Sequence, residues 1–151
     1  MIFSGSINTK PVPKQRPKLT RSGRAYNPQK TRDAQRQQAF LFRLAANSSE
    51  IEFPFPPKTP LCVTLRFYHK GGKTNAPKMT VPDVDNLVKL TLDAMTNANI
   101  WRDDNQITKI ISEDYWAGPD GQPRIEFVVE KHIVQSIQED ETTQMELFAA
   151  K

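Results

Sequence analysis

The 151-residue sequence contains a single cysteine, Cys62. One cysteine excludes an internal disulfide framework and a cysteine-rich zinc site. No apolar run is long enough to cross a membrane, and the first ten residues lack the basic and apolar regions of a signal peptide. We therefore expect one globular domain of ordinary size in a reducing cytoplasm, with Cys62 as a small buried strand residue.

Acidic residues are almost missing from the first third of the sequence. Residues 1–46 contain ten lysines and arginines and one acid, Asp33, whereas residues 47–151 carry an excess of acids. The formal net charge of +4 therefore hides a strongly basic N-terminal block. A phosphate backbone is the obvious polyanionic partner for such a block, and a solvated basic arm without a partner is the alternative.

The basic block has two parts. Three prolines in residues 10–26 exclude a regular helix or a central strand, so we expect an extended loop along a nucleic-acid backbone. Asn27 and Pro28 then predict the start of a helix over about 28–46. Its arginines share one stripe, which is either DNA-facing or merely solvated. The candidate DNA-binding residues are Lys14, Arg16, Lys18, Arg21 and Arg24 in the loop and Arg32, Arg36 and Arg43 in the helix. An apolar side of this helix is expected from Phe40, Leu41, Leu44 and Ala45.

Alternating hydrophobic residues predict strands over residues 2–8, 61–68, 107–116 and 124–130. A second helix, over about 84–98, is apolar on nearly all sides and must be buried between a sheet and a second surface, such as a partner subunit. The expected order is β-α-β-α-β-β, an α+β fold with a small mixed sheet of about four strands and two helices. We expect this domain over residues 1–135 and a disordered acidic tail over 136–151.

Aspartates stand in pairs at both ends of the second helix. Asp83 and Asp85 precede and open it, and Asp103 and Asp104 follow it. A helix cap needs only one aspartate, so the second carboxylate at the start is surplus, and so is the later pair. If the chain folds back after the helix, the carboxylates converge, and a hard divalent cation, Mg²⁺ or Mn²⁺, is then their usual counter-charge.

Lys89 lies one helical turn after Asp85 and one turn before Asp93. A ladder of surface ion pairs explains this spacing. A lysine near a helix N-terminus is unfavourably placed against the helix dipole, which favours a second role beside a scissile phosphate. His69, at the end of a predicted strand, is either structural or a ligand or base. The residues alone thus suggest metal-dependent phosphodiester hydrolysis on a basic platform.

Two runs of sequence, DVDNLVKLTLDAM from Asp83 and IWRDDNQI from Ile100, resemble the signature of the RusA family of Holliday-junction resolvases. The resemblance extends over about residues 1–131. It implies a Mg²⁺-dependent endodeoxyribonuclease that acts as a homodimer and cuts four-way DNA junctions with paired nicks, in recombination and repair. It also implies metal binding by Asp83, Asp85 and Asp104, an active-site lysine at Lys89, and a neighbouring role for Asp103.

The chain ends in QMELFAAK. Gln144, Leu147 and Phe148 resemble the short peptide with which many bacterial DNA enzymes bind the sliding clamp, although Met145 and Glu146 depart from its usual form. A disordered segment that presents two adjacent large apolar residues suits a pocket on a partner. The alternative is that this segment docks on its own domain.

Two other functions fit the same residues. A non-catalytic DNA-binding recombination module would use its carboxylates only as caps and ion pairs. A clamp-tethered adaptor would depend mainly on its tail. Loss of cleavage with retained junction binding in Asp85→Asn would distinguish an enzyme from the DNA-binding module. Loss of function in cells with unchanged nuclease activity in vitro, after deletion of residues 144–151, would identify the adaptor.

Overall fold

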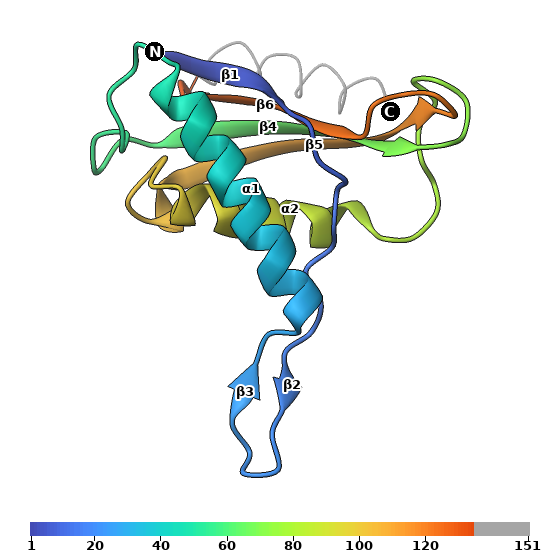
Figure 1. Cartoon of the computed structure of the whole chain (residues 1–151). Helices are drawn as coiled ribbons and strands as arrows, with labels where there is room; N and C mark the ends of the chain where they lie inside the picture. Colours follow the sequence, from blue (N-terminus) through green and yellow to red (C-terminus); the bar gives the residue numbers. More distant parts are fainter. Residues whose placement is uncertain (135–151) are drawn as a thin grey trace, which may run out of the picture.

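A mixed four-stranded sheet forms one layer of the protein, and two helices cover one face of it (Figure 1). The structure is a computed structural model and describes residues 1–134. The strands follow the order β1-β6-β4-β5, with β4 and β5 parallel and the other neighbours antiparallel. Their bounds are Ile2–Ile7 for β1, Leu61–Lys70 for β4, Ile107–Gly118 for β5 and Arg124–Lys131 for β6. The expected α+β architecture is confirmed.

The helices α1 (Gln29–Asn47) and α2 (Val84–Asn97) lie on the same face of the sheet. Parallel neighbours such as β4 and β5 need a crossover connection, and α2 provides it. The chain leaves β4 at one end of the strands, runs back along α2, and enters β5 at the opposite end (Figure 1). The two ends of α2, near which the predicted carboxylates lie, are therefore held at opposite ends of the strands.

The second surface that buries α2 belongs to the same chain. α2 packs against the sheet and against α1, and Leu87, Leu90 and Ala94 are fully buried there. A buried hydrogen bond joins the helices, since Thr91 Oγ1 donates to Gln38 Oε1 at 3.0 Å. The apolar pattern of α2 is thus explained without a partner subunit.

The buried side of α1 matches the expected one only in part, since Leu41 and Ala45 pack against the core. Phe40 and Leu44 are 56% and 48% exposed, while Ala39, Phe42 and Ala46 are buried. Phe42 sets this orientation by packing edge-on against a phenylalanine of β6, with ring centroids 5.3 Å apart. The buried stripe also includes Thr31 and Gln38, and these polar residues hide it from a hydrophobicity pattern.

Residues 18–26 form a β-hairpin rather than an extended loop. β2 (Lys18–Leu19) pairs antiparallel with β3 (Ala25–Tyr26), and the hairpin projects away from the body at the start of α1 (Figure 1). Gly23, with φ of 83°, provides the left-handed residue that a short hairpin loop needs. The last proline of this segment is Pro17, so all residues of the hairpin retain a backbone N–H.

No helix within residues 1–134 combines the length and the hydrophobicity needed to cross a bilayer. The predicted acidic tail over 136–151, with its clamp-binding residues Gln144, Leu147 and Phe148, lies outside the described residues.

Candidate metal centre

Asp83 and Asp85 lie where the loop after β4 enters α2. Asp83 is the N-cap residue, with φ of −68° and ψ of 144°, but its side chain makes no capping hydrogen bond to the helix. Asp85 follows in the first turn. Both residues are exposed, and both line an open hollow of about 520 Å³. The helix therefore uses neither carboxylate as a cap, and both remain accessible to a cation.

Asp114 of β5 lines the same hollow. Its Oδ1 lies 2.7 Å from Nε2 of His69, and the two side chains are only 9% and 10% exposed. The imidazole of His69 also packs edge-on against Trp116, at 6.4 Å between centroids. His69, which the sequence left open, is thus paired with a carboxylate. Asp114 belongs to no sequence motif. The sequence marks it only as an acidic residue at an inward-facing strand position, which pairs with the buried Phe67 of β4.

A lysine lines the hollow as well, but it is Lys78. Its Nζ donates to the backbone oxygens of Thr80 and Val81, at 2.8 and 3.0 Å, and lies 5.4 Å from the centroid of Trp116. The predicted Lys89 is exposed on α2, one turn after Asp85, and is not part of the lining. The structure therefore places one basic side chain at the hollow and a second within reach of the same end of α2.

Asp103 and Asp104 lie beyond the other end of α2, where the 3₁₀ helix η1 (Asp104–Gln106) begins. Asp103 caps η1, since its Oδ1 accepts a hydrogen bond of 3.1 Å from the N–H of Asn105. A hydrogen bond to Asp103 raises the pKa of Asp104, and burial and repulsion from Asp103 and Asp93 act in the same direction. Repulsion of this kind between carboxylates is relieved by a bound divalent cation. Asp103 is thus the cap and Asp104 the carboxylate left for a cation.

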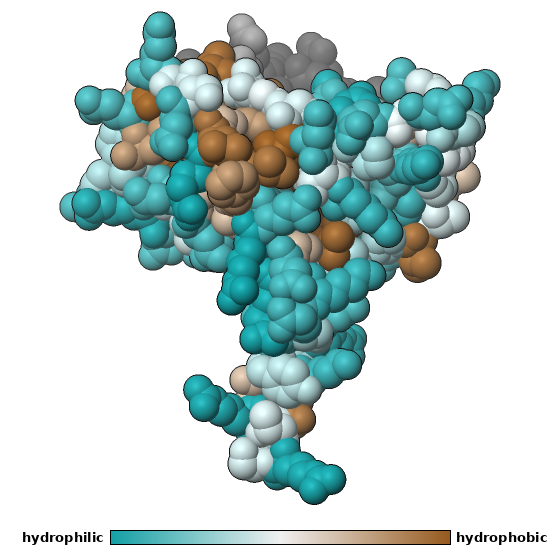
Figure 2. All heavy atoms as spheres, viewed as in Figure 1, coloured by the Kyte–Doolittle hydropathy of each residue, from teal (hydrophilic) through white to brown (hydrophobic). Residues whose placement is uncertain are grey.

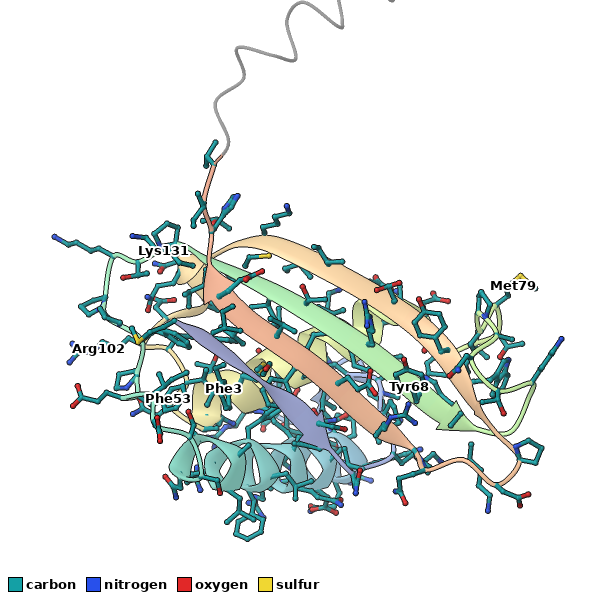
Figure 3. All side chains as sticks on the ribbon, turned by 90° about the horizontal axis from the view of Figure 1, so that it is seen from above. Phe3, Phe53, Tyr68, Met79, Arg102 and Lys131 are labelled. Carbon is teal, nitrogen blue, oxygen red and sulfur yellow. The ribbon has the colours of Figure 1, made fainter. Side chains whose placement is uncertain are left out.

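The predicted metal ligands do not converge within one chain. The 14 residues of α2, about 20 Å of helix, separate the aspartates at its start from those beyond its end. Figure 3 shows this separation, because Met79 in the loop before α2 and Arg102 in the loop after it lie at opposite ends of the sheet. Within residues 1–134, no group of three or more histidine, cysteine or acidic side chains is placed to hold a metal.

The oxygen-only donor set nevertheless fits a hard divalent cation such as Mg²⁺. Asp83 and Asp85 offer two exposed carboxylates at one end of the strands, and Asp104 offers a third at the opposite end. Each end of the strands thus offers part of a donor set.

Two of the predicted DNA-binding residues contact another element of the fold, whereas Arg32 donates only to Gln29 of its own helix. Lys14 Nζ forms an ion pair of 2.7 Å with Asp93 of α2, which attaches the base of the hairpin to that helix. Arg43 donates to the backbone oxygen of Asn97 at the end of α2, at 3.2 Å. The other predicted residues are exposed on the hairpin, just before it, or on the outer face of α1. They are Arg16, Lys18, Arg21, Arg24, Arg32 and Arg36.

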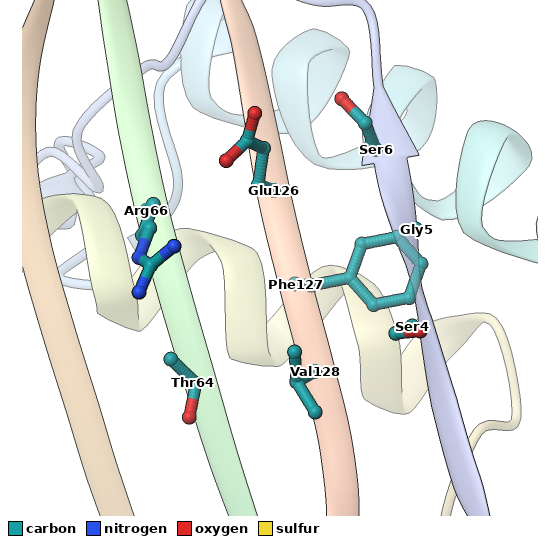
Figure 4. Close-up of a pocket in the computed structure, with 8 residues that line it drawn as sticks. All are labelled: Ser4, Gly5, Ser6, Thr64, Arg66, Glu126, Phe127 and Val128. Atoms are coloured by element: carbon teal, nitrogen blue, oxygen red, sulfur yellow. The ribbon is translucent and has the colours of Figure 1, made fainter. Parts of the chain in front are cut away.

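Another hollow, of about 430 Å³, lies on the face of the sheet that the helices leave open (Figure 4). Residues of β1, β4 and β6 line it, among them Ser4, Thr64 and Glu126. Arg66 also lines it, and its Nε donates to Glu113 at 3.0 Å. The sheet separates this hollow from α2, so it contributes nothing to the candidate metal centre.

The family model of endodeoxyribonuclease RusA matches residues 8–130 of the chain. No curated protein matches the chain. The matched range contains the hairpin, both helices and every carboxylate of the candidate metal centre. The RusA resemblance of the run that begins at Asp83 is therefore confirmed, and the chain belongs to the RusA family of endodeoxyribonucleases.

Proposed function

We propose that the protein is a Mg²⁺-dependent endonuclease that resolves four-way DNA junctions by paired nicks, as a homodimer, in cytoplasmic recombination and repair. Family membership makes it an endodeoxyribonuclease. The observation that carries the proposal further is the position of the carboxylates. At one end of the strands Asp83 and Asp85 are exposed and the side chain of Asp83 makes no capping hydrogen bond, and at the other end Asp103 and Asp104 repel each other. Both arrangements favour a divalent cation over a purely structural role.

In this proposal Asp83, Asp85 and Asp104 hold the cation, with Mn²⁺ as a possible substitute for Mg²⁺. The bound cation would activate water and stabilise the leaving oxygen. Lys89 neutralises charge that develops on the scissile phosphate. Its replacement by alanine is expected to lower kcat about 10²–10³-fold with little change in junction affinity.

A dimer would bring these separated ligands together. Because one chain holds them at opposite ends of its strands, we propose that each site combines Asp83 and Asp85 with the partner's Asp104. A two-fold axis across β5 would achieve this, because β5 is the edge strand of the sheet. The preceding loop covers the end of this strand, where the N–H of Lys78 donates to the oxygen of Asp114. Within the described residues, the backbone of 107–113 pairs with β4 alone.

The uncovered part of β5 is self-complementary. Ile110 and Ile111 are 48% and 41% exposed there. Alternate residues point their backbone groups to the same edge, so Ile110 and Ser112 point theirs to the edge where Asp114 bonds to Lys78. Antiparallel pairing about Ile110 would form a hydrogen-bonded pair with the partner's Ile110, and it would set Lys109 opposite the partner's Ile111.

The same register moves the third carboxylate to the site. Pairing about Ile110 would place the partner's Gln106 level with Asp114, at the end of β5 that borders the hollow and that the preceding loop covers. The partner's Asp104 would then lie at the end of the strands where Asp83 and Asp85 open α2. One symmetric contact would thus build two complete sites.

Cleavage of a synthetic four-way junction beside a linear duplex of the same sequence, with Mg²⁺ and with EDTA, tests the proposal. We expect symmetric nicks in the junction only, and only with metal. Asp85→Asn should abolish them and leave junction binding intact. A wild-type protein that binds junctions and cuts with neither Mg²⁺ nor Mn²⁺ would be the non-catalytic recombination module instead.

We propose a separate role for Gln144, Leu147 and Phe148 in binding the sliding clamp. Deleting residues 144–151 should leave nuclease activity in vitro unchanged and remove retention on immobilised clamp. A truncated protein that is retained on the clamp as strongly as the full chain would contradict this role. Loss of cellular function with intact nuclease activity would favour the adaptor.

A further inference from the structure

The hairpin of residues 18–26 carries two large side chains that are exposed to solvent. Leu19 is 71% exposed and Tyr26 is 44% exposed. Because Lys18 pairs with Tyr26 and Leu19 with Ala25, the two side chains lie on opposite faces of the ribbon. Figure 2 shows the hairpin standing clear of the body, with hydrophobic atoms among hydrophilic ones. An arm that only contacted phosphates would need neither side chain.

The charge of residues 10–26, the hairpin and the segment before it (together the arm), indicates the partner. Residues 10–26 contain six lysines and arginines and no acid. Three of these bases, Lys18, Arg21 and Arg24, are exposed on the hairpin itself. Basic side chains beside an exposed ring and an apolar group are typical of surfaces that track phosphates and stack on bases. The matching partner is a nucleic acid whose base faces are accessible.

Continuous duplex DNA does not offer base faces, because each pair is stacked between its neighbours and shows only its edges in the grooves. In the open form of a branched DNA this stacking is interrupted at the branch point, and the faces of the flanking pairs are exposed. The chemistry of the arm therefore fits the branch point of a DNA junction better than a linear duplex.

The base of the hairpin is attached to the helix that carries the candidate metal ligands. Besides its ion pair with Asp93, Lys14 donates its backbone N–H to the oxygen of Asn86 at 3.0 Å. Asn86 follows Asp85 directly. The N–H of Gln15 also donates to Thr31 Oγ1 at the start of α1, at 3.3 Å. The hairpin and the carboxylates at the start of α2 are therefore held in a fixed relation.

The loop of the hairpin is also ordered by its own hydrogen bonds. Thr20 accepts from the N–H of Gly23 at 2.9 Å through its backbone oxygen, and from the N–H of Arg24 at 3.1 Å through its hydroxyl. The N–H of Thr20 donates in turn to the oxygen of Arg24 at 2.9 Å. The ribbon thus presents a preorganised tip and needs little ordering on binding.

We propose that the hairpin enters the open centre of a branched DNA, where Tyr26 and Leu19 stack on the base pairs that flank the branch. Lys18, Arg21 and Arg24 contact the surrounding phosphates. The hairpin thereby selects branched over linear DNA, and its attachment at Asn86 sets the distance from the branch to the cut. This inference rests on the proposed function and deepens it by assigning the residues that recognise the branch.

The test uses the full chain and a four-way junction with 2-aminopurine next to the branch, beside a linear duplex with the same label. Tyr26→Ala and Leu19→Ser should each weaken junction binding about tenfold, which corresponds to the loss of one stacking contact with a base. Duplex binding should stay unchanged, and the fluorescence change at the branch should shrink. Tyr26→Phe, which keeps the ring, should bind like the wild type. Ile133→Ala removes a side chain of similar exposure, 77%, outside the hairpin and serves as the control.

Three results would overturn the inference while the proposed function stands. The two hairpin variants could bind and perturb the branch as the wild type does. They could weaken junction and duplex binding equally, which would indicate phosphate contacts alone. They could lower the mass of the DNA-free protein in sedimentation, which would show that Leu19 or Tyr26 contacts a second copy. A wild-type protein with no preference for junctions over duplex would instead contradict the proposed function itself.

Discussion

Mixing two inactive variants should restore cleavage if each metal site takes ligands from two chains. Asp85→Asn removes a ligand at the start of α2, and Asp104→Asn removes one beyond its end. Each variant alone should be inactive, since both sites of its homodimer lack a ligand. In a mixed dimer, however, one site loses both Asp85 and Asp104, and the other keeps all of its carboxylates.

The size of the recovery follows from the symmetry. Random exchange at equal concentrations gives about half mixed dimers, each with one intact site, so about a quarter of the wild-type sites should be active. The separation of the ligands by about 20 Å of helix makes this outcome specific, because a chain that built its own site could not be complemented. The mixed dimer should also make single nicks rather than paired ones.

The assay is nicking of a junction in a supercoiled plasmid, where one nick gives an open circle and paired nicks give a linear product. A mixture of Asp83→Asn and Asp85→Asn is the matched control, because both substitutions lie on the same side of the site and no mixed dimer is intact. Recovery in neither mixture, despite subunit exchange shown by a tagged chain, would refute the shared site.

The interface itself can be tested at Ile110. Ile110→Lys would place two like charges on the proposed two-fold axis, and we expect a monomer in sedimentation that no longer cuts. Ile133→Lys, at an exposed position away from β5, should leave the mass and the activity unchanged. A dimeric Ile110→Lys with full activity would exclude this edge as the contact.

Further predictions concern the fold. Phe42→Ala should destabilise the protein by about 3–5 kcal/mol, whereas Phe40→Ala, on the exposed side of the same helix, should cost less than about 0.5 kcal/mol in urea unfolding. Hydrogen bonds from Tyr115 and Arg66 lower the pKa of Glu113 below its ordinary 4.5. The ionised Glu113 should therefore stabilise the folded protein at pH values above 4.5, by less than about 1 kcal/mol at this partly exposed position. In melting curves, the advantage of the wild type over Glu113→Gln should vanish as the pH falls through the lowered pKa, and an advantage that grew in acid would refute it.

The strands and α2 could be predicted because burial repeats with the period of the backbone. Leu61, Val63 and Leu65 alternate along β4, and all three are fully buried in the core. The hydrophobic period fails where polar residues are buried, as in α1, where Gln38 accepts a hydrogen bond from the hydroxyl of Thr91 across the helix pair. It also fails at the hairpin, because two residues on each strand are too few to show alternation.

The residue types of the candidate site could be read from the sequence, but their positions in the fold could not. The types and spacing of Asp83, Asp85 and Asp104 suggest a cation, yet no local pattern tells at which end of the strands each will lie. That depends on the crossover, in which α2 runs from one end of the strands to the other. The pair of His69 and Asp114, 45 residues apart in sequence, likewise exists only through the register of β4 and β5.

A shared site has a consequence for the reaction. If Asp104 must come from the partner, a free monomer cannot assemble a full set of ligands, so cation binding and dimer assembly become linked. The two-fold axis that completes one site completes the other, and it relates the two cuts by the same symmetry that relates opposite strands of a four-way junction. Paired nicks would then need no communication between sites beyond the symmetry of the contact. Affinity for Mg²⁺ should accordingly rise with protein concentration, and a Mg²⁺ affinity independent of concentration across the dimerisation range would contradict this linkage.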